Sequence, residues 1–179
     1  ATAGGACTGT GVSPLVIDAN VGAVAGSVRV LNRDEGLIPR MISVRYVMTF
    51  DYKRAAQSMM GGGAVLCCAG ALAAYRRSAV MPVLNDWLHQ TFRGGPARVG
   101  EDHAMTNFIL QHGYKVRYQR SAKVWTKTPT TYGGLCKMFL RWGRSNIRET
   151  VHTSRFVFTP FRKEGKLGIR FNFLMCAVG

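Results

Sequence analysis

Acidic residues are scarce in this sequence. Its 179 residues include 24 Lys and Arg against 9 Asp and Glu, which gives a formal net charge of +15, although only 18% of the residues are charged. The positive balance therefore arises from missing acids. It favours partners that carry phosphate, namely nucleotides, nucleic acid or an anionic membrane surface, with a solvated basic surface as the alternative. Because acids are few, each remaining one is more informative about function.

Metal-ligand spacing is also missing. The cysteines are odd in number and show none of the paired spacing of a zinc site. They are Cys7, Cys67, Cys68, Cys136 and Cys176. The histidines, His89, His103, His112 and His152, show no ligand spacing either. We interpret the cysteines as reduced, mostly buried thiols in a cytosolic setting, and predict no metal site built from His and Cys.

Long apolar runs are missing as well. The first residues lack the basic region and apolar core of a signal peptide, and no run reaches the ~20 residues that cross a bilayer. The last stretch, 171–179, is mostly apolar and follows four cations, Arg162, Lys163, Lys166 and Arg170. It predicts either the beginning of a membrane span, with its cations on the cytoplasmic side, or a short terminal element packed on the core.

The remaining composition suits one ordinary domain, because 47% of the residues are apolar. Residues 1–11 contain only Ala, Thr, Gly and Cys, so they have little to bury and are expected to be flexible. The valine-rich segment 21–32 predicts a buried strand. A long helix is predicted over 37–59, with Pro39 in its first turn. One apolar stripe at helical spacing runs along it: Leu37, Met41, Val44, Met48, Tyr52, Ala55 and Met59.

The middle of the chain is rich in small residues. Segment 64–75 predicts a strand, a tight passage at Ala69 and Gly70, and then a second strand or turn. Gly70 would let the backbone approach a ligand closely, or would simply allow close packing. Ser78 is expected to cap a short helix that reaches Gln90, and 91–99 to be a loop.

An acidic pair opens the next predicted helix, which runs from Glu101 to Gln111 and stops at Gly113. Glu101 and Asp102 can be simple caps, favoured by the helix dipole, or catalytic acids. Segments 114–118 and 122–126 read as strands. Strands that alternate with helices predict an α/β layered fold with a largely parallel sheet.

A basic helix is predicted over 137–148. At steps of 4, 3 and 4 it carries a cationic stripe of Lys137, Arg141, Arg144 and Arg148. Trp142 lies beside this stripe. Such a stripe suits phosphate binding, a lipid headgroup layer or an ordinary wet surface.

Several of these pieces occur in a familiar order and spacing. They are the segments 21–26, 54–58 and 68–72, Tyr75-Arg76, Asp86-Trp87, Gly100-Glu101-Asp102 with Thr106-Asn107, and Arg141-Trp142. In this order they resemble the processive, membrane-bound family 2 glycosyltransferases over roughly residues 20–150. The likeness is greatest to hyaluronan synthases and nodulation-type N-acetylglucosaminyltransferases, with chitin and cellulose synthases more distant.

The resemblance implies an inverting transfer of a sugar, expected to be N-acetylglucosamine, from a UDP-sugar to a growing β-linked polysaccharide or oligosaccharide. It implies a partial nucleotide-diphospho-sugar transferase fold of the GT-A type, and Mg²⁺ or Mn²⁺ on the diphosphate. It implies membrane lipid as a partner, a place in the cell membrane with the catalytic part on the cytoplasmic face, and no nucleic acid.

Roles for individual residues also follow from the resemblance. Asp102 matches the family's general base, with Glu101 as its neighbour in the substrate site. Arg141 and Trp142 match the end of a Gln-x-x-Arg-Trp motif beside the diphosphate and the acceptor sugar. The other expected substrate-binding residues are Cys68, Ala69, Gly70, Asp86 and Trp87.

Two departures from the family pattern stand out. Met138 occupies the position of the motif's glutamine and has no amide to donate or accept. The donor half, with its Asp-x-Asp metal motif, would precede residue 20, so no metal ligand is expected within this chain and Asp18 is not taken as one. The predicted organisation is a flexible start (1–19), the C-terminal half of a catalytic domain (20–130), a basic amphipathic interface helix (131–155), and a linker with a truncated membrane segment (156–179).

Two other functions remain open from the residues alone. A basic nucleic-acid-binding module accounts for the charge of +15, but it leaves Glu101 and Asp102 unexplained and lacks interleaved aromatic and basic residues. A noncatalytic membrane-surface relative is compatible with Met138 and the basic C-terminal region.

Overall fold

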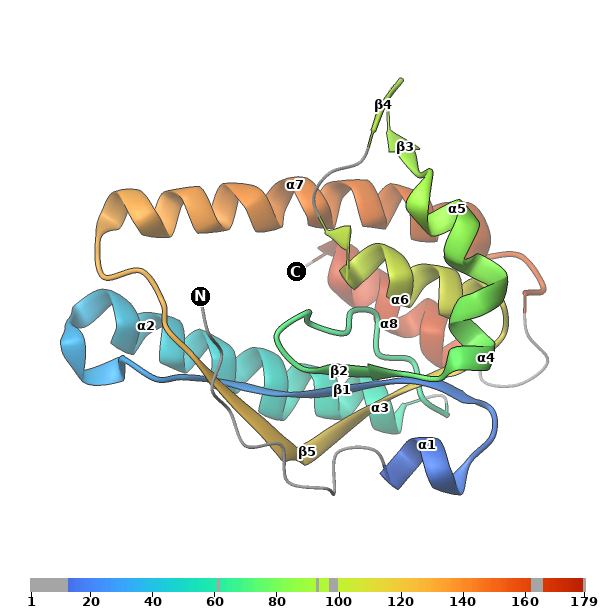
Figure 1. Ribbon diagram of the computed structural model, residues 1–179, viewed down its shortest axis with the longest axis horizontal. Helices are drawn as coiled ribbons and strands as arrows, with labels where there is room; N and C mark the ends of the chain where they lie inside the picture. Colours follow the sequence, from blue (N-terminus) through green and yellow to red (C-terminus); the bar gives the residue numbers. More distant parts are fainter. Residues whose placement is uncertain (1–12, 61, 93, 97–99, 162–165, 179) are drawn as a thin grey trace.

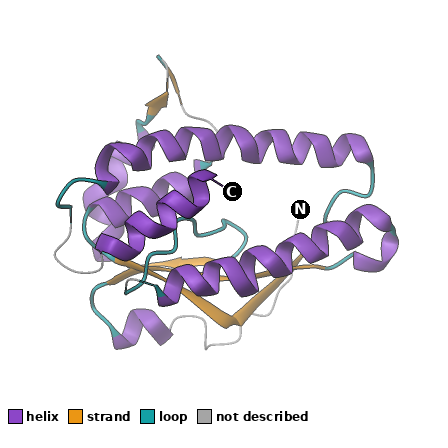
Figure 2. Ribbon diagram, turned by 180° about the vertical axis from the view of Figure 1, so that it is seen from behind, coloured by secondary structure: helices purple, strands orange, loops and turns teal. Residues whose placement is uncertain are grey.

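The structure is a computed structural model that describes residues 13–178 apart from 61, 93, 97–99 and 162–165. Its main sheet has three strands, with α6 (Glu101–Gln111), α7 (Tyr132–Val157) and α8 (Lys166–Val178) on one side and α1 (Ser13–Ile17) on the other (Figures 1 and 2). Residues 1–12 of the expected flexible start lie outside the described part, whereas Ser13–Ile17 form the short helix α1.

The sheet has the order β2-β1-β5 and mixed pairing. β1 (Val21–Val30) runs parallel to β5 (Lys115–Thr126) and antiparallel to β2 (Ala73–Tyr75). The strand predicted over 21–32 is confirmed, and its Val and Ala side chains are buried because both faces of the sheet are covered. The long β1–β5 pairing agrees with the predicted largely parallel sheet, and only the short β2 runs antiparallel. The two strands predicted over 114–126 are one strand, with an irregular register opposite Gly26 and Ser27.

The helix predicted over 37–59 is confirmed, but its middle is a π-helix. It comprises α2 (Leu37–Tyr46), the π segment η3 (Val47–Arg54) and α3 (Ala55–Met59). The apolar stripe along this helix is not its packed face. Most of the stripe is exposed, and these residues have relative exposures of 58% to 82%: Leu37, Met41, Val44, Met48, Tyr52 and Met59.

A partly polar face of this helix packs inward instead. Ile42 and Phe50 are buried together with Gln57 and Ser58. The two polar side chains bond to neighbouring backbone: Gln57 Oε1 accepts from Leu66 N (3.5 Å), and Ser58 Oγ accepts from Tyr118 N (3.0 Å). Hydrogen bonds of this kind allow polar groups to be buried at little cost, so apolar spacing alone could not identify the inner face.

The segment between α3 and α6 is mostly short turns and helices. Only Ala64 of the predicted first strand pairs, in a bridge to Val116, before β2 begins at Ala73. The short helical elements are α4 (Arg77–Val80), η4 (Met81–Val83) and α5 (Leu84–Leu88), preceded earlier in the chain by η2 (Arg33–Glu35). The predicted Ser78 cap was wrong, because Arg76 holds the N-cap position. Within 91–99, expected to be a loop, Thr91–Phe92 (β3) and Gly95–Pro96 (β4) pair antiparallel.

The helix predicted over 101–111 is confirmed as α6 (Glu101–Gln111), and Gly113 follows with a φ of +87°. The basic helix extends beyond its cationic stretch 137–148 at both ends. It is α7 (Tyr132–Val157), which begins where the Thr131 hydroxyl accepts from Gly134 N at 3.3 Å. Its C-terminal turns pack against α6 and α8.

The expected beginning of a membrane segment coincides with α8 (Lys166–Val178). Its Ile169, Asn172 and Phe173 are buried, and Asn172 Nδ2 donates to Ala64 O at 3.1 Å. Leu167, Phe171, Leu174 and Met175 are exposed on its other side. Among the helices that the structure describes, none combines the length and apolar character needed to span a bilayer.

Candidate active site

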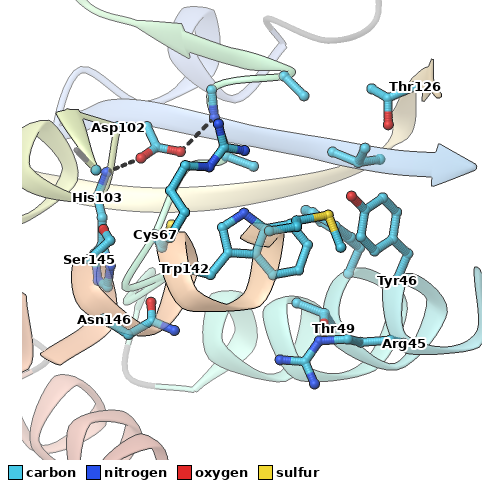
Figure 3. Close-up of a pocket in the computed structure, with 18 of the residues that line it drawn as sticks. Arg45, Tyr46, Thr49, Cys67, Asp102, His103, Thr126, Trp142, Ser145 and Asn146 are labelled. Atoms are coloured by element: carbon cyan, nitrogen blue, oxygen red, sulfur yellow. Dashed lines mark hydrogen bonds between the residues drawn. The ribbon is translucent and has the colours of Figure 1, made fainter. Parts of the chain in front are cut away.

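A cavity of about 750 Å³ opens between the α2–η3 helix, the loop at 67–71, the beginning of α6 and the middle of α7. Figure 3 shows Asp102 and His103 at one end of the cavity, Trp142 in the centre, and Tyr46 and Arg45 at the other end. Val28 of β1 and Thr126 and Lys127 at the end of β5 also line it, so its wall is formed by segments that lie far apart in the sequence.

Asp102 is held in this cavity by two backbone donors. Gly70 N donates to Oδ2 at 2.9 Å, and His103 N donates to Oδ1 at 2.8 Å. Because an ionised carboxylate has about four lone-pair positions, two remain for a ligand. An added Cβ at Gly70 would lie 3.6 Å from the Asp102 carboxylate, which is an ordinary van der Waals contact, so this hydrogen bond does not require glycine. Asp102 therefore has a fixed orientation and free acceptor capacity.

Trp142 and Arg141 line the same cavity from α7. The Trp142 ring contacts the rings of Tyr46 (centroids 6.2 Å apart) and Phe139 (5.7 Å). The Arg45 guanidinium lies 5.0 Å from the Phe139 centroid. These contacts connect α7 to α2 and hold the indole between them.

The cationic stripe predicted on α7 is not a single surface. Lys137, Arg141 and Arg144 are exposed, whereas Arg148 is buried. Its Nε donates to Glu149 Oε1 at 2.5 Å, and its Nη2 donates to Gly100 O at 3.2 Å. Arg148 is therefore bound within the protein and is not available as a phosphate ligand.

A buried polar network around Arg148 attaches α7 to α6. Glu149 is 2% exposed, and its Oε2 accepts from Asn107 Nδ2 at 2.8 Å. Thr153 Oγ1 donates to Asn107 Oδ1 at 3.1 Å. These directional bonds define which face of α7 meets α6. They consequently place Trp142, two turns earlier on α7, opposite Asp102.

The structure brings together some of the expected site residues and separates others. Glu101, Asp102, Ala69, Gly70, Arg141 and Trp142 line the cavity. Cys68 is fully buried in the core and does not line it; the neighbouring Cys67 does. Asp86 is exposed outside the cavity, and Trp87 connects α5 to α6 by donating from Nε1 to Glu101 O at 3.1 Å.

Several cavity residues were missed by sequence reasoning: Arg45, Tyr46, Thr49, Arg54 and His103. Four of them belong to the long helix formed by α2, η3 and α3, whose inner face does not follow its apolar stripe. A π-helix often occurs at a functional site, but the sequence has no signal for one. The sequence signal that could have identified these cavity residues is the pair Arg45 and Arg54, which lie outside the apolar stripe.

The electrostatics near Asp102 are dominated by burial. Burial lowers the pKa of His103 to about 4, and the charges of Arg54 and Arg148 act in the same direction while Asp102 opposes them. Burial also raises the pKa of the Cys67 thiol, which the nearby Arg54 partly offsets. His103 is therefore neutral and Cys67 is a thiol near pH 7.

The described residues contain no cluster of three or more His, Cys, Asp or Glu side chains arranged to hold a metal ion. Asp18, which was not expected to be a ligand, pairs with Lys115 at 3.4 Å. Asn20 N donates to the Asp18 carboxylate and is the main cause of its lowered pKa.

The family model described as glycosyltransferase like family 2 matches residues 11–145. The chain belongs to glycosyltransferase family 2. Hyaluronan synthase 3 of Homo sapiens is 39% identical over 149 residues, which are 83% of this chain and 27% of that protein. An N-acetylglucosaminyltransferase of Neorhizobium galegae is 38% identical over 134 residues, 75% of this chain and 30% of that protein.

Hyaluronan synthase 2 of Xenopus laevis is similarly close, at 38% identity over 80% of this family 2 chain and 26% of its own length. The chain thus spans roughly a quarter to a third of these relatives. The family resemblance drawn from the ordered motifs is confirmed. The activities in the names of these relatives belong to the complete proteins, of which this chain matches only a part.

Proposed function

We propose that this chain forms the acceptor and general-base half of a membrane-associated, inverting family 2 glycosyltransferase. The complete protein would transfer a sugar, which we propose to be N-acetylglucosamine, from a UDP-sugar to a growing β-linked saccharide. The observation that carries the proposal is the single cavity shared by the oriented Asp102 carboxylate, Arg141 and Trp142. Family membership and the names of the relatives support it.

Asp102 acts as the general base in this proposal. The acceptor hydroxyl oxygen forms a bond to the anomeric carbon while the bond from that carbon to the diphosphate oxygen breaks. The hydroxyl proton passes to the Asp102 carboxylate, and UDP departs with the bonding electron pair. Because the hydroxyl becomes acidic only as the new bond forms, the position of the carboxylate matters more than its ground-state basicity. The Gly70 and His103 amides supply that position.

Arg141 and Trp142 act on the other groups. The Arg141 guanidinium pairs with charge that develops on the leaving diphosphate, and the Trp142 indole stacks on a pyranose ring of the acceptor. Met138, which lines the cavity beside them, offers apolar contact where the family motif has an amide. The proposed site therefore has no side-chain amide at the position of Met138.

A divalent cation fits the family but not the described residues, which hold no suitable ligand cluster. Its ligands would belong to the donor half of the complete protein. We also propose a place at the cell membrane, with this part on the cytoplasmic face. The basic charge of +15 supports contact with anionic lipid there.

The test is Asp102→Asn in the complete protein, assayed in membranes with UDP-N-acetylglucosamine. We expect polymer synthesis to fall by at least ~100-fold, since a positioned base contributes about 10²–10⁴, while UDP affinity stays within about twofold of the parent. Asp34→Asn, at an exposed position in η2, is the matched control and should retain full activity. Polymer synthesis that survives in Asp102→Asn would refute the base assignment.

A further inference from the structure

Two side chains in the cavity wall carry buried polar atoms without a hydrogen-bond partner. They are Arg54, through Nε and Nη1, and His103, through Nδ1. Arg54 ends the π-helix η3 and His103 lies in the first turn of α6. Since buried polar groups are nearly always paired, two unpaired groups in one cavity indicate a missing partner.

Arg54 also has no counter-charge. The ion pairs among the described residues involve Arg29, Lys115 and Arg148, but not Arg54. Its guanidinium lies 4.8 Å from the Phe50 ring centroid, which offsets only part of the cost of desolvating a cation. Because the Arg54 side chain is half-buried and lacks a salt-bridge partner in the described part of the chain, it is less stable there than a paired cation would be. A ligand of negative charge would remove that penalty.

His103 complements Arg54 as a neutral hydrogen-bonding group. The charged and titratable groups around its ring are Arg54, Arg148 and Asp102, and Asn146 of α7 interacts with its side chain. Because the ring is buried and two cations lie near it, it stays neutral and can direct one nitrogen into the cavity. The pair thus combines a charged fork with an adjacent uncharged ring.

We propose that Arg54 and His103 form an oxyanion subsite in this cavity, separate from Arg141. The subsite rests on the proposed function, because it would hold an anionic group of the substrate beside Asp102. Two groups have the required chemistry: the diphosphate of the donor and the carboxylate of an acidic sugar at the end of the acceptor. Either presents a pair of oxygens that a guanidinium can bind through two parallel hydrogen bonds.

The experiment measures ligand affinity by titration calorimetry in the complete, detergent-solubilised protein. The variants are Arg54→Gln and His103→Asn, with Arg40→Gln as the matched control on the exposed side of the same helix. The titrants are UDP, a β-linked oligosaccharide ending in glucuronic acid, and a counterpart ending in N-acetylglucosamine. Arg54→Gln should weaken one of the first two by at least ~10-fold, and His103→Asn should weaken the same titrant by a smaller factor.

The titrant that weakens identifies the source of the oxyanion: UDP points to the donor diphosphate, and the acidic oligosaccharide to the acceptor. Unchanged affinity for both in Arg54→Gln overturns the subsite. Thermal unfolding supplies a second readout, because removal of an uncompensated charge should leave Tm equal or higher. A lower Tm with unchanged affinities would assign Arg54 a purely structural role.

Arg54→Lys keeps the charge but loses the fork, so it is measured as a second variant if Arg54→Gln folds poorly. It should lose several-fold in affinity for the same titrant. Failure of the subsite is distinguishable from failure of the proposed function. Unchanged anion affinities in Arg54→Gln, together with lost synthesis in Asp102→Asn, would leave the base assignment intact.

Discussion

Replacing Glu149 with leucine tests whether the buried network attaches α7 to α6. The variant removes the carboxylate that accepts from Arg148 Nε at 2.5 Å and from Asn107 Nδ2 at 2.8 Å. The Arg148 side chain, 10% exposed, would retain only its bond to Gly100 O. Removing one partner of a buried ion pair costs about 3–5 kcal/mol because the other charge remains buried and uncompensated.

Equilibrium unfolding in urea measures this cost. With a slope of about 2 kcal/mol per M, a loss of 3–5 kcal/mol lowers the midpoint by about 1.5–2.5 M. The double variant Arg148→Met with Glu149→Leu removes both charges, so it should recover at least ~1 kcal/mol relative to Glu149→Leu alone. Asp34→Asn is the exposed control and should remain within about 0.5 kcal/mol of the parent.

Two results would contradict this reasoning. A loss below about 1 kcal/mol in Glu149→Leu would show that the pair is solvated or replaceable. A double variant as unstable as Glu149→Leu would show that the cost arises from lost packing or from Asn107, and not from the unpaired Arg148 charge.

Two further predictions concern the neighbourhood of Asp102. Gly100→Ala should lower the free energy of unfolding in urea by at least ~2 kcal/mol, because φ is +89° and the new Cβ would lie 1.9 Å from Ser145 Oγ. The control Gly62→Ala, where φ is +72° and the surrounding space is open, should lower it by only about 1–2 kcal/mol. Equal losses of stability in the two variants would exclude a role for Ser145. The pKa of His103 is lowered to about 4, so the unfolded chain binds one more proton between about pH 6.5 and 4, and folding stability should fall by ~3 kcal/mol across that window as pH decreases. His103→Gln should remove this part of the pH dependence; an unchanged profile would show that His103 is solvated.

Much of the fold followed from local pattern. The strand at Val21–Val30 and the helices at 37–59 and 101–111 were predicted because apolar spacing, turns and caps act within a few residues. The packed face of the long helix was not predictable in this way. Gln57 and Ser58 are buried because backbone groups of Leu66 and Tyr118 meet them, and those partners are known only after the chain has folded.

The site residues divide in the same way: sequence motifs predicted some of them, and only the folded structure identified the others. Asp102, Arg141 and Trp142 were found because ordered motifs mark them, and they do line one cavity. Arg54 was part of a quoted motif segment but received no role, because its direction depends on the π-helix at Val47–Arg54. Cys68 and Cys67 are adjacent in sequence, and only the course of the loop decides which of them reaches the cavity.

The polar attachment of α7 to α6 has a consequence for how this helix can vary. Its inner residues set the rotation of the helix, and rotation by one position would move Trp142 by about 100° around the helix axis. The outward residues Leu140, Arg144 and Ile147 have no such constraint, since all are exposed. The outer face of α7 can therefore change in size, charge or polarity to suit different surroundings without displacing the indole from the cavity.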